Sequence, residues 1–206
     1  AIAHWNLERL ADALSPLLPN PNELSAGLDR YHAVYASEFC TAYAAKLGFR
    51  SWMNDDADLL ESLFDLLYHG EIDMTEFFRR LADLAVDDPQ LATVQSAFYR
   101  DDLAGQVAPG LTRWLARYAA RLRQDGDSAA ERIARMNRAN PRYVLRNYLA
   151  QQAIDLAEQG DTTMIAELLA VLRHPYDEQE GAERFSAKRP DWARHRAGCS
   201  MLSCSS

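Results

Sequence analysis

The most reactive side chains in this sequence are three thiols, at Cys40, Cys199 and Cys204. Their number is odd and no two of them form a Cys-x-x-Cys pair, so the pattern favours neither a zinc site nor the disulfide framework of a secreted protein. Unpaired thiols are typical of a reducing compartment. We therefore expect a cytoplasmic protein.

The surroundings of the three thiols differ. Cys40 lies at helical spacing between Phe39 and Tyr43, which predicts a small buried apolar residue. Cys199 and Cys204 lie in a C-terminal stretch that contains Ser and Gly, where we expect accessible thiols.

Other residue types that support catalysis occur without the spacing that catalysis needs. The five histidines never form an i, i+4 pair around a carboxylate, so a catalytic zinc helix is disfavoured. The nine glycines occur singly, with no glycine-rich phosphate loop, and no G-x-S-x-G elbow is present. We predict no catalytic, cofactor-binding or metal-binding residue in this chain.

Three acidic clusters have a structural interpretation. The stretch from Asp55 to Asp58 resembles a calcium loop but lacks the Gly and Glu that such a loop requires at its sixth and twelfth positions. Helix capping explains it better, with Asn54 or Asp55 as the cap. The pairs Asp87-Asp88 and Asp101-Asp102 are interpreted as turn residues ahead of helix N-termini.

The charge balance disfavours nucleic acid as a partner. The formal net charge is -8, whereas affinity for phosphate backbones comes mostly from accumulated Lys and Arg. One series of arginines recurs at helical spacing, and we interpret it as a solvated face or a carboxylate-pairing surface. Its members are Arg113, Arg117, Arg121, Arg123, Arg132, Arg135, Arg138, Arg142 and Arg146.

The sequence also disfavours membrane insertion and secretion. No apolar run approaches the roughly 20 residues that span a bilayer, so no membrane span is expected. Residues 1–5 lack the basic and apolar regions of a secretory signal, and they lack an initiator Met. We expect that the chain begins inside a longer one.

Apolar residues recur with helical periodicity throughout, and no alternating strand pattern is convincing, so the sequence predicts an all-α fold of eight or nine helices in an irregular bundle. The start and stop signals of these helices are proline, glycine and capping residues, among them Gly48, the capping box of Asp73 and Glu76, and Pro109-Gly110. In the last helix Ile165, Leu168, Leu169 and Leu172 are expected to face inward. The expected helices cover residues 7–18, 22–47, 55–69, 73–84, 111–125, 129–136, 141–159 and 162–173.

Residues 1–176 are expected to form this helical domain, and residues 177–206 an irregular tail that ends in Cys-Ser-Ser. Tyr176, Phe185 and Trp192 are its expected anchors. Residues 87–108 have weak periodicity and are a soft boundary, although one bundle is favoured over two domains.

Four stretches carry a resemblance to a known family. They are Trp5–Ala11, Met136–Ala150, Pro175-Tyr176 and Cys204–Ser206. On these residues the chain resembles the C-terminal part of a selenoprotein O family protein adenylyltransferase, of the bacterial type that contains cysteine. The resemblance covers nearly the whole chain.

The resemblance implies a longer enzyme with a kinase-like N-terminal lobe. Such an enzyme binds ATP with magnesium or manganese and transfers AMP to Ser, Thr or Tyr hydroxyls of other proteins. The nucleotide-binding and catalytic residues of the family lie upstream of the segment that begins like Trp5, so none is assigned to this chain. The implied partners are the kinase-like lobe of the same protein and the substrate proteins.

The resemblance also implies a role for Cys204. The matching position is selenocysteine in many animal members and cysteine in bacterial ones, and it is thought to pair reversibly with a cysteine near the activation segment. Cys204 is therefore the candidate redox switch. Cys199 departs from the simplest family pattern and is a weaker candidate, since pairing it with Cys204 needs a tight loop.

An alternative hypothesis stays open at this point. The chain can also be interpreted as a stand-alone helical protein-interaction module without catalytic activity, using the basic faces from Arg117 to Arg146 or an aromatic groove. A small-molecule enzyme is disfavoured because the site chemistry is missing.

Overall fold

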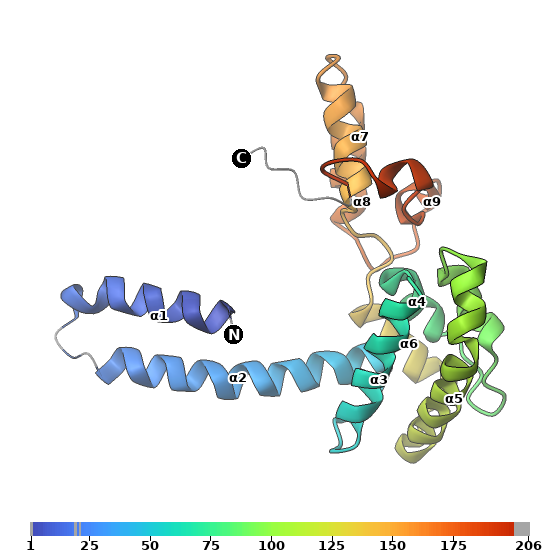
Figure 1. Cartoon of the computed structure of the whole chain (residues 1–206), viewed down its shortest axis with the longest axis horizontal. Helices are drawn as coiled ribbons and strands as arrows, with labels where there is room; N and C mark the ends of the chain where they lie inside the picture. The colour runs from blue at the N-terminus through green and yellow to red at the C-terminus, as the bar shows by residue number, and fades with distance from the viewer. Residues whose placement is uncertain (1, 19, 21, 200–206) are drawn as a thin grey trace. The chain divides into compact units, whose positions relative to one another are not determined.

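The computed structural model describes residues 2–18, 20 and 22–199, and the predicted all-α class is confirmed. These residues form nine α-helices, labelled α1 to α9 in Figure 1, and three short 3-10 helices, called η1 to η3 here. They contain no strand, although Ile72 and Phe98 form an isolated antiparallel bridge. No helix among them is both long and apolar enough to cross a bilayer.

The chain divides into two compact units, Ala1–Ala44 and Ala45–Ser206, called here the N-terminal unit and the C-terminal unit. The sequence suggested a soft boundary within residues 87–108 and a tail after residue 176. The division between the two units falls inside the helix Asn22–Leu47, near its C-terminal end, and the predicted domain bounds stay predictions.

The N-terminal unit contains α1 (Ile2–Leu14), η1 (Ser15–Leu17) and most of α2 (Asn22–Leu47). Pro16 lies at the start of η1, where a missing backbone N–H costs little. As predicted, α2 stops at Gly48, which follows its last residue and whose φ of 75° suits a residue without Cβ.

The first half of the C-terminal unit is a helical cluster around an aromatic pair. Its elements are α3 (Asp56–His69), α4 (Met74–Leu81), η2 (Leu91–Ala97), α5 (Asp101–Asp125) and α6 (Ala129–Ala139) (Figure 1). Trp114 and Tyr118 of α5 stack with ring centroids 5.1 Å apart. Trp114 Nε1 donates to the carbonyl of Leu59 at 2.8 Å, and Tyr118 Oη donates to that of Leu47 at 2.7 Å. Both buried polar atoms are therefore satisfied.

Helix α5 is longer than the sequence predicted. We expected Pro109-Gly110 to precede its first turn, but the helix begins at Asp101 and contains Pro109. Proline removes one backbone hydrogen bond inside a helix. Val107 and Leu111 on either side of it are both buried, and their packing offsets that loss.

The second half of the C-terminal unit contains α7 (Asn147–Ala157), α8 (Thr163–Leu172), α9 (Glu183–Ser186) and η3 (Asp191–Arg194). The prediction that a helix starts at Asn140-Pro141 was wrong. The backbone N–H groups of Arg142 and Tyr143 donate to the carbonyl of Pro175, at 2.8 and 3.1 Å. This long-range pairing holds the segment outside helical geometry until α7 begins.

The described part of the predicted tail packs against α7 and α8. Phe185 is buried in a core cluster with Tyr148 and Leu168, so its role as an anchor is confirmed. Tyr176 is 44% exposed and is not a buried anchor. Trp192 is 45% exposed but contacts the Tyr148 ring edge-on, with centroids 6.3 Å apart.

Candidate functional site

Cys199 is the one C-terminal candidate thiol that the described residues include, since Cys204 lies outside them. The expectation that Cys199 is accessible was wrong: it is free but only 6% exposed. The preceding Gly198 has a φ of 80°, and a Cβ there would lie 2.7 Å from Gln151 Oε1. The positive φ favours glycine at this position, and a Cβ there would also displace the end of the Gln151 side chain. Cys40, which we expected to be buried, is half-buried.

A small polar cavity surrounds Cys199. Its volume is about 330 Å³, and its lining comes from three segments: the start of α5, the start of α7 and the C-terminal residues. The lining residues are Tyr99, Arg146, Asn147, Tyr148, Arg189 and Cys199. The arrangement brings a thiol, two guanidinium groups and two phenols to one place.

One wall of the cavity is a buried ion pair. Arg146 donates two hydrogen bonds to the Asp73 carboxylate, at 2.5 and 3.0 Å, and Tyr99 Oη donates a third at 2.5 Å. Asp73 also caps α4 by accepting from the backbone N–H of Glu76 at 3.0 Å, as the sequence predicted. One carboxylate thus joins α4, the start of α5 and the start of α7.

The electrostatics of this wall follow from burial and from these bonds. Burial by itself raises the pKa of Asp73, but the hydrogen bonds from Arg146, Tyr99 and Glu76 outweigh it, so the pKa is below its usual value. Burial and the neighbouring Asp73 raise the pKa of Tyr99 to about 12. Asp73 is therefore ionised near pH 7, but its lowered pKa and its three hydrogen-bonded partners make it a weak base. Tyr99 stays neutral there and cannot accept a proton as a phenolate.

The residues that lead to Cys199 form a strap, defined here as residues 187–199, which is fastened at several points. Tyr148 Oη donates to the carbonyl of Ala187 at 2.7 Å. Arg194 forms two hydrogen bonds with the Glu71 carboxylate, at 2.8 and 2.6 Å, and Arg196 pairs with Asp155 at 2.7 Å. The strap therefore connects α7 with the loop that precedes α4.

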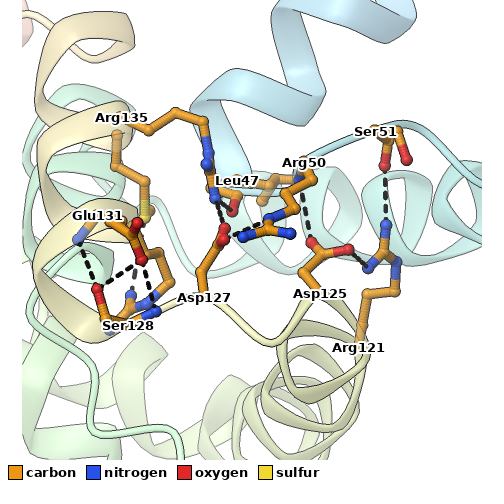
Figure 2. Close-up of polar contacts among 12 residues, drawn as sticks. Leu47, Arg50, Ser51, Arg121, Asp125, Asp127, Ser128, Glu131 and Arg135 are labelled. Carbon is orange, nitrogen blue, oxygen red and sulfur yellow. Dashed lines mark hydrogen bonds and ion pairs between the residues drawn. The ribbon is translucent and has the colours of Figure 1, made fainter.

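A second polar network joins α5, α6 and the segment after α2 (Figure 2). Asp127 lies between Arg50 and Arg135 and forms an ion pair with each. The hydrogen bond from Arg135 is the main reason that the pKa of Asp127 is below its usual value. Asp125 accepts from the backbone N–H of Arg50 at 3.0 Å and from Arg121 at 2.9 Å.

This network confirms the carboxylate-pairing interpretation for much of the arginine series. Arg121, Arg123, Arg135, Arg142 and Arg146 form ion pairs with Asp or Glu. Arg132 is buried and donates to the carbonyls of Ala82 and Leu84. The remaining three, Arg113, Arg117 and Arg138, are exposed, as a solvated face requires.

The acidic stretch before α3 functions differently from the prediction. Asp55 is the N-cap residue but makes no side-chain capping bond. Asp56 is 1% exposed, accepts from the backbone N–H of Met53 at 2.8 Å and pairs with Arg121 at 2.8 Å. Its carboxylate is therefore an interior ion-pair partner, and the described residues contain no group of three or more Asp, Glu, His or Cys side chains placed to hold a metal ion.

An apolar groove of about 590 Å³ lies along α7 and α8. We expected Ile165, Leu168, Leu169 and Leu172 to face inward together, but only Leu168 is buried. Ile165 is 47% exposed, Leu169 is 53% exposed, and Ile154 of α7 is 49% exposed. These three side chains line the groove.

Sequence reasoning missed the group formed by Asp73, Tyr99 and Arg146. The sequence separations are 26 residues between Asp73 and Tyr99 and 73 residues between Asp73 and Arg146. The predicted capping box pointed to Asp73, and the arginine series included Arg146, but each was interpreted by itself. No local signal connects them.

Comparison with known proteins provides a family assignment. A sequence model described as protein adenylyltransferase SelO matches residues 1–173. A protein nucleotidyltransferase YdiU of Tolumonas auensis is 55% identical over 206 residues, which is 100% of this chain and 40% of the relative. Proteins of the same name from Aromatoleum aromaticum and Methylobacillus flagellatus are 53% and 55% identical, again over 100% of this chain and over 39% and 40% of the relatives. The chain thus spans about two fifths of the length of these relatives.

Proposed function

Because this chain belongs to the protein adenylyltransferase SelO family, we propose that it is the C-terminal helical region of an enzyme that transfers AMP from ATP to Ser, Thr or Tyr hydroxyls of other proteins. The observation that carries this proposal is the 55% identity over the full length of the chain to a protein nucleotidyltransferase. In this proposal the helices support a kinase-like core, and the enzyme works in the bacterial cytoplasm.

The described residues are poorly suited to hold the nucleotide and its metal. The buried carboxylates are already used, since Asp56 pairs with Arg121 and Asp73 with Arg146. The half-buried Asp127 pairs with Arg50 and Arg135. Magnesium or manganese would need free carboxylates as ligands, and ATP would need free groups that donate hydrogen bonds to its phosphates. We therefore assign ATP and metal binding to the part of the parent enzyme outside this chain.

A redox switch at Cys204 is the second part of the proposal. Two thiols, that of Cys204 and one outside this chain, would lose two protons and two electrons as the disulfide forms, with hydrogen peroxide or oxidised glutathione as the acceptor. The strap supports this idea, because hydrogen bonds at Ala187, Arg194 and Arg196 hold it on the C-terminal unit. The burial of Cys199 makes it the less suitable thiol for exchange.

The test is an AMP-transfer assay with labelled ATP and magnesium, comparing the parent enzyme with the 206-residue chain. We expect protein labelling by the parent enzyme and none by the chain alone. Labelling by the chain alone would overturn the assignment of the nucleotide site. For the switch, Cys204→Ser should remove the dependence of the rate on added peroxide, while Cys40→Ser should leave it. An unchanged peroxide response in Cys204→Ser contradicts the switch.

The groove along α7 and α8 favours a second candidate function, that of a helical protein-interaction module. Exposed apolar patches on folded domains commonly mark sites of protein contact. Leu169→Lys should then abolish binding of a partner that the unmodified chain binds, while Arg138→Lys on an exposed face should leave it. Full AMP transfer by the parent enzyme together with no partner for the isolated chain would reject this alternative.

A further inference from the structure

The N-terminal unit has almost no interior of its own. No residue of α1 is buried, and Ala44 is the only buried residue in the part of α2 that belongs to this unit. Several large apolar side chains are exposed instead: Ile2 and Leu17 at 77%, Trp5 at 56% and Tyr35 at 57%. The contact between α1 and α2 includes the ring of His4 against those of Tyr31 and His32, with centroids 6.4 and 4.2 Å away.

Such a unit cannot be stable alone. A helix of 13 residues, the length of α1, is marginal in water because nucleation is costly. Ordering each residue costs roughly 1–2 kcal/mol, and burial of apolar surface is the main term that offsets this cost. With Leu7 and Ala11 only half-buried and no residue of α1 fully buried, that term is small. The unit therefore requires an additional surface to pack against.

One face of α2 is suited to such packing. Tyr31, Tyr35, Phe39 and Tyr43 follow each other at i, i+4 spacing, and their successive ring centroids lie 5.8, 6.2 and 4.6 Å apart. We call these four residues the aromatic stripe. Aromatic side chains bring large contact area at low entropic cost and are enriched at protein interfaces.

The charge of this unit narrows the choice of partner. Residues 1–44 contain five Asp or Glu and two Arg, with no Lys. A helix that binds an anionic membrane surface or nucleic acid needs an excess of Lys and Arg on its polar face. The stripe is therefore suited to a protein surface.

The comparisons favour a surface in the rest of a longer polypeptide. The family match covers residues 1–173 without a break at the division between the units, so the N-terminal unit is part of the shared family architecture. This chain spans only 40% of the Tolumonas relative. The remaining length of such a protein offers the surface that α1 and α2 lack, and it is present at a fixed one-to-one ratio.

We propose that the aromatic stripe and the exposed side of α1 pack against the part of the parent polypeptide that lies outside this chain. The inference rests on the proposed function insofar as it takes the chain to be a region of a longer adenylyltransferase. It names the surface through which that region is joined to the rest.

The test is hydrogen exchange at dilute, monomeric concentration, measured in the parent protein and in the 206-residue chain. We expect the amides of residues 2–14 and 22–43 to exchange at least roughly 100-fold more slowly in the parent protein. Equal exchange in both would overturn the proposal. Exchange that slows in the isolated chain as its concentration rises would also overturn it, in favour of a second copy as the partner.

A matched pair of variants in the parent protein tests the stripe itself. Tyr35→Asp places a charge on the aromatic stripe and should speed exchange in α2 by about tenfold or more, since a buried aromatic anchor contributes more than 1.4 kcal/mol. Ser37→Asp adds the same charge to an exposed residue two positions along the helix and should leave exchange unchanged. Equal effects of the two variants contradict the proposal.

Measuring AMP transfer on the same samples separates the two hypotheses. If the parent protein protects α1 and α2 but transfers no AMP, the proposed function fails and the packing surface remains. If it transfers AMP while α1 and α2 stay unprotected, the packing surface fails and the proposed function remains.

Discussion

The two units of this chain are both helical, yet they differ in what holds them. In the C-terminal unit, Leu63, Phe77 and Leu115 are completely buried, and buried ion pairs connect its helices. In the N-terminal unit, apolar side chains as large as Trp5 and Tyr35 are more than half exposed. Helical periodicity alone therefore does not distinguish a segment that folds by itself from one that needs a partner, because both have an apolar stripe.

The largest expected effect comes from removing one tryptophan from each unit. Trp114→Ala should lower the free energy of unfolding of the C-terminal unit by about 3–5 kcal/mol, since Trp114 is 2% exposed and its removal leaves a cavity. Trp5→Ala should change it by less than about 0.5 kcal/mol. Urea unfolding of the chain followed by far-UV circular dichroism measures both, and similar losses would remove the contrast between the units.

The next effect concerns the buried ion pair between α3 and α5. Arg121→Met should cost about 3 kcal/mol of stability, because it leaves the carboxylate of Asp56 in the interior without a counter-charge. Arg117→Met, one helical turn away on the exposed face, is the control and should cost less than about 0.5 kcal/mol. A cost for Arg121→Met as small as that of the control would show that Asp56 is solvated.

Two glycines in or beside α2 should respond in opposite directions. Gly48→Ala should destabilise the chain by at least roughly 1–2 kcal/mol, because φ is 75° there and the new Cβ would lie 2.8 Å from Met136 Sδ. Gly27→Ala should stabilise α2 by up to about 1 kcal/mol, because Ala has the higher helix propensity. A Cβ at Gly27 has no neighbour within 4 Å, so no clash opposes this gain. Thermal melts and far-UV circular dichroism give both signs, and destabilisation by Gly27→Ala would mean that its surface is already covered.

The smallest expected effect is a pH dependence of the free energy of unfolding of the C-terminal unit. The pKa of Asp73 is lower in the folded protein than in the unfolded chain, so the unfolded chain binds more protons in acid. The stabilisation from Asp73 is therefore complete above the unfolded pKa of about 4 and is lost as the pH falls through the lower, folded pKa. Urea unfolding between pH 2.5 and 7 should show the stability difference between the wild type and Asp73→Asn shrinking in acid. A difference that is independent of pH would contradict an ionised Asp73 in the fold.

Much of the fold could be predicted because its signals are local. The capping pair of Asp73 and Glu76, and the stop at Gly48, each depend on backbone geometry within a few residues. The predicted start of a helix at Asn140-Pro141 was also a local interpretation, and it was wrong because the carbonyl of Pro175 binds that segment. A local helix signal fails where hydrogen bonds to a distant residue hold the backbone in another conformation.

The sequence by itself determined the all-α class and the family, because helix periodicity and long motifs are properties of neighbouring residues. It left the arginine series open between a solvated face and carboxylate pairing. Only the tertiary structure decided which apolar stripes are buried, that Cys199 is enclosed, and that Asp73, Tyr99 and Arg146 meet. Burial of a side chain depends on how segments far apart in the chain pack together, and a local sequence pattern carries no information on that packing.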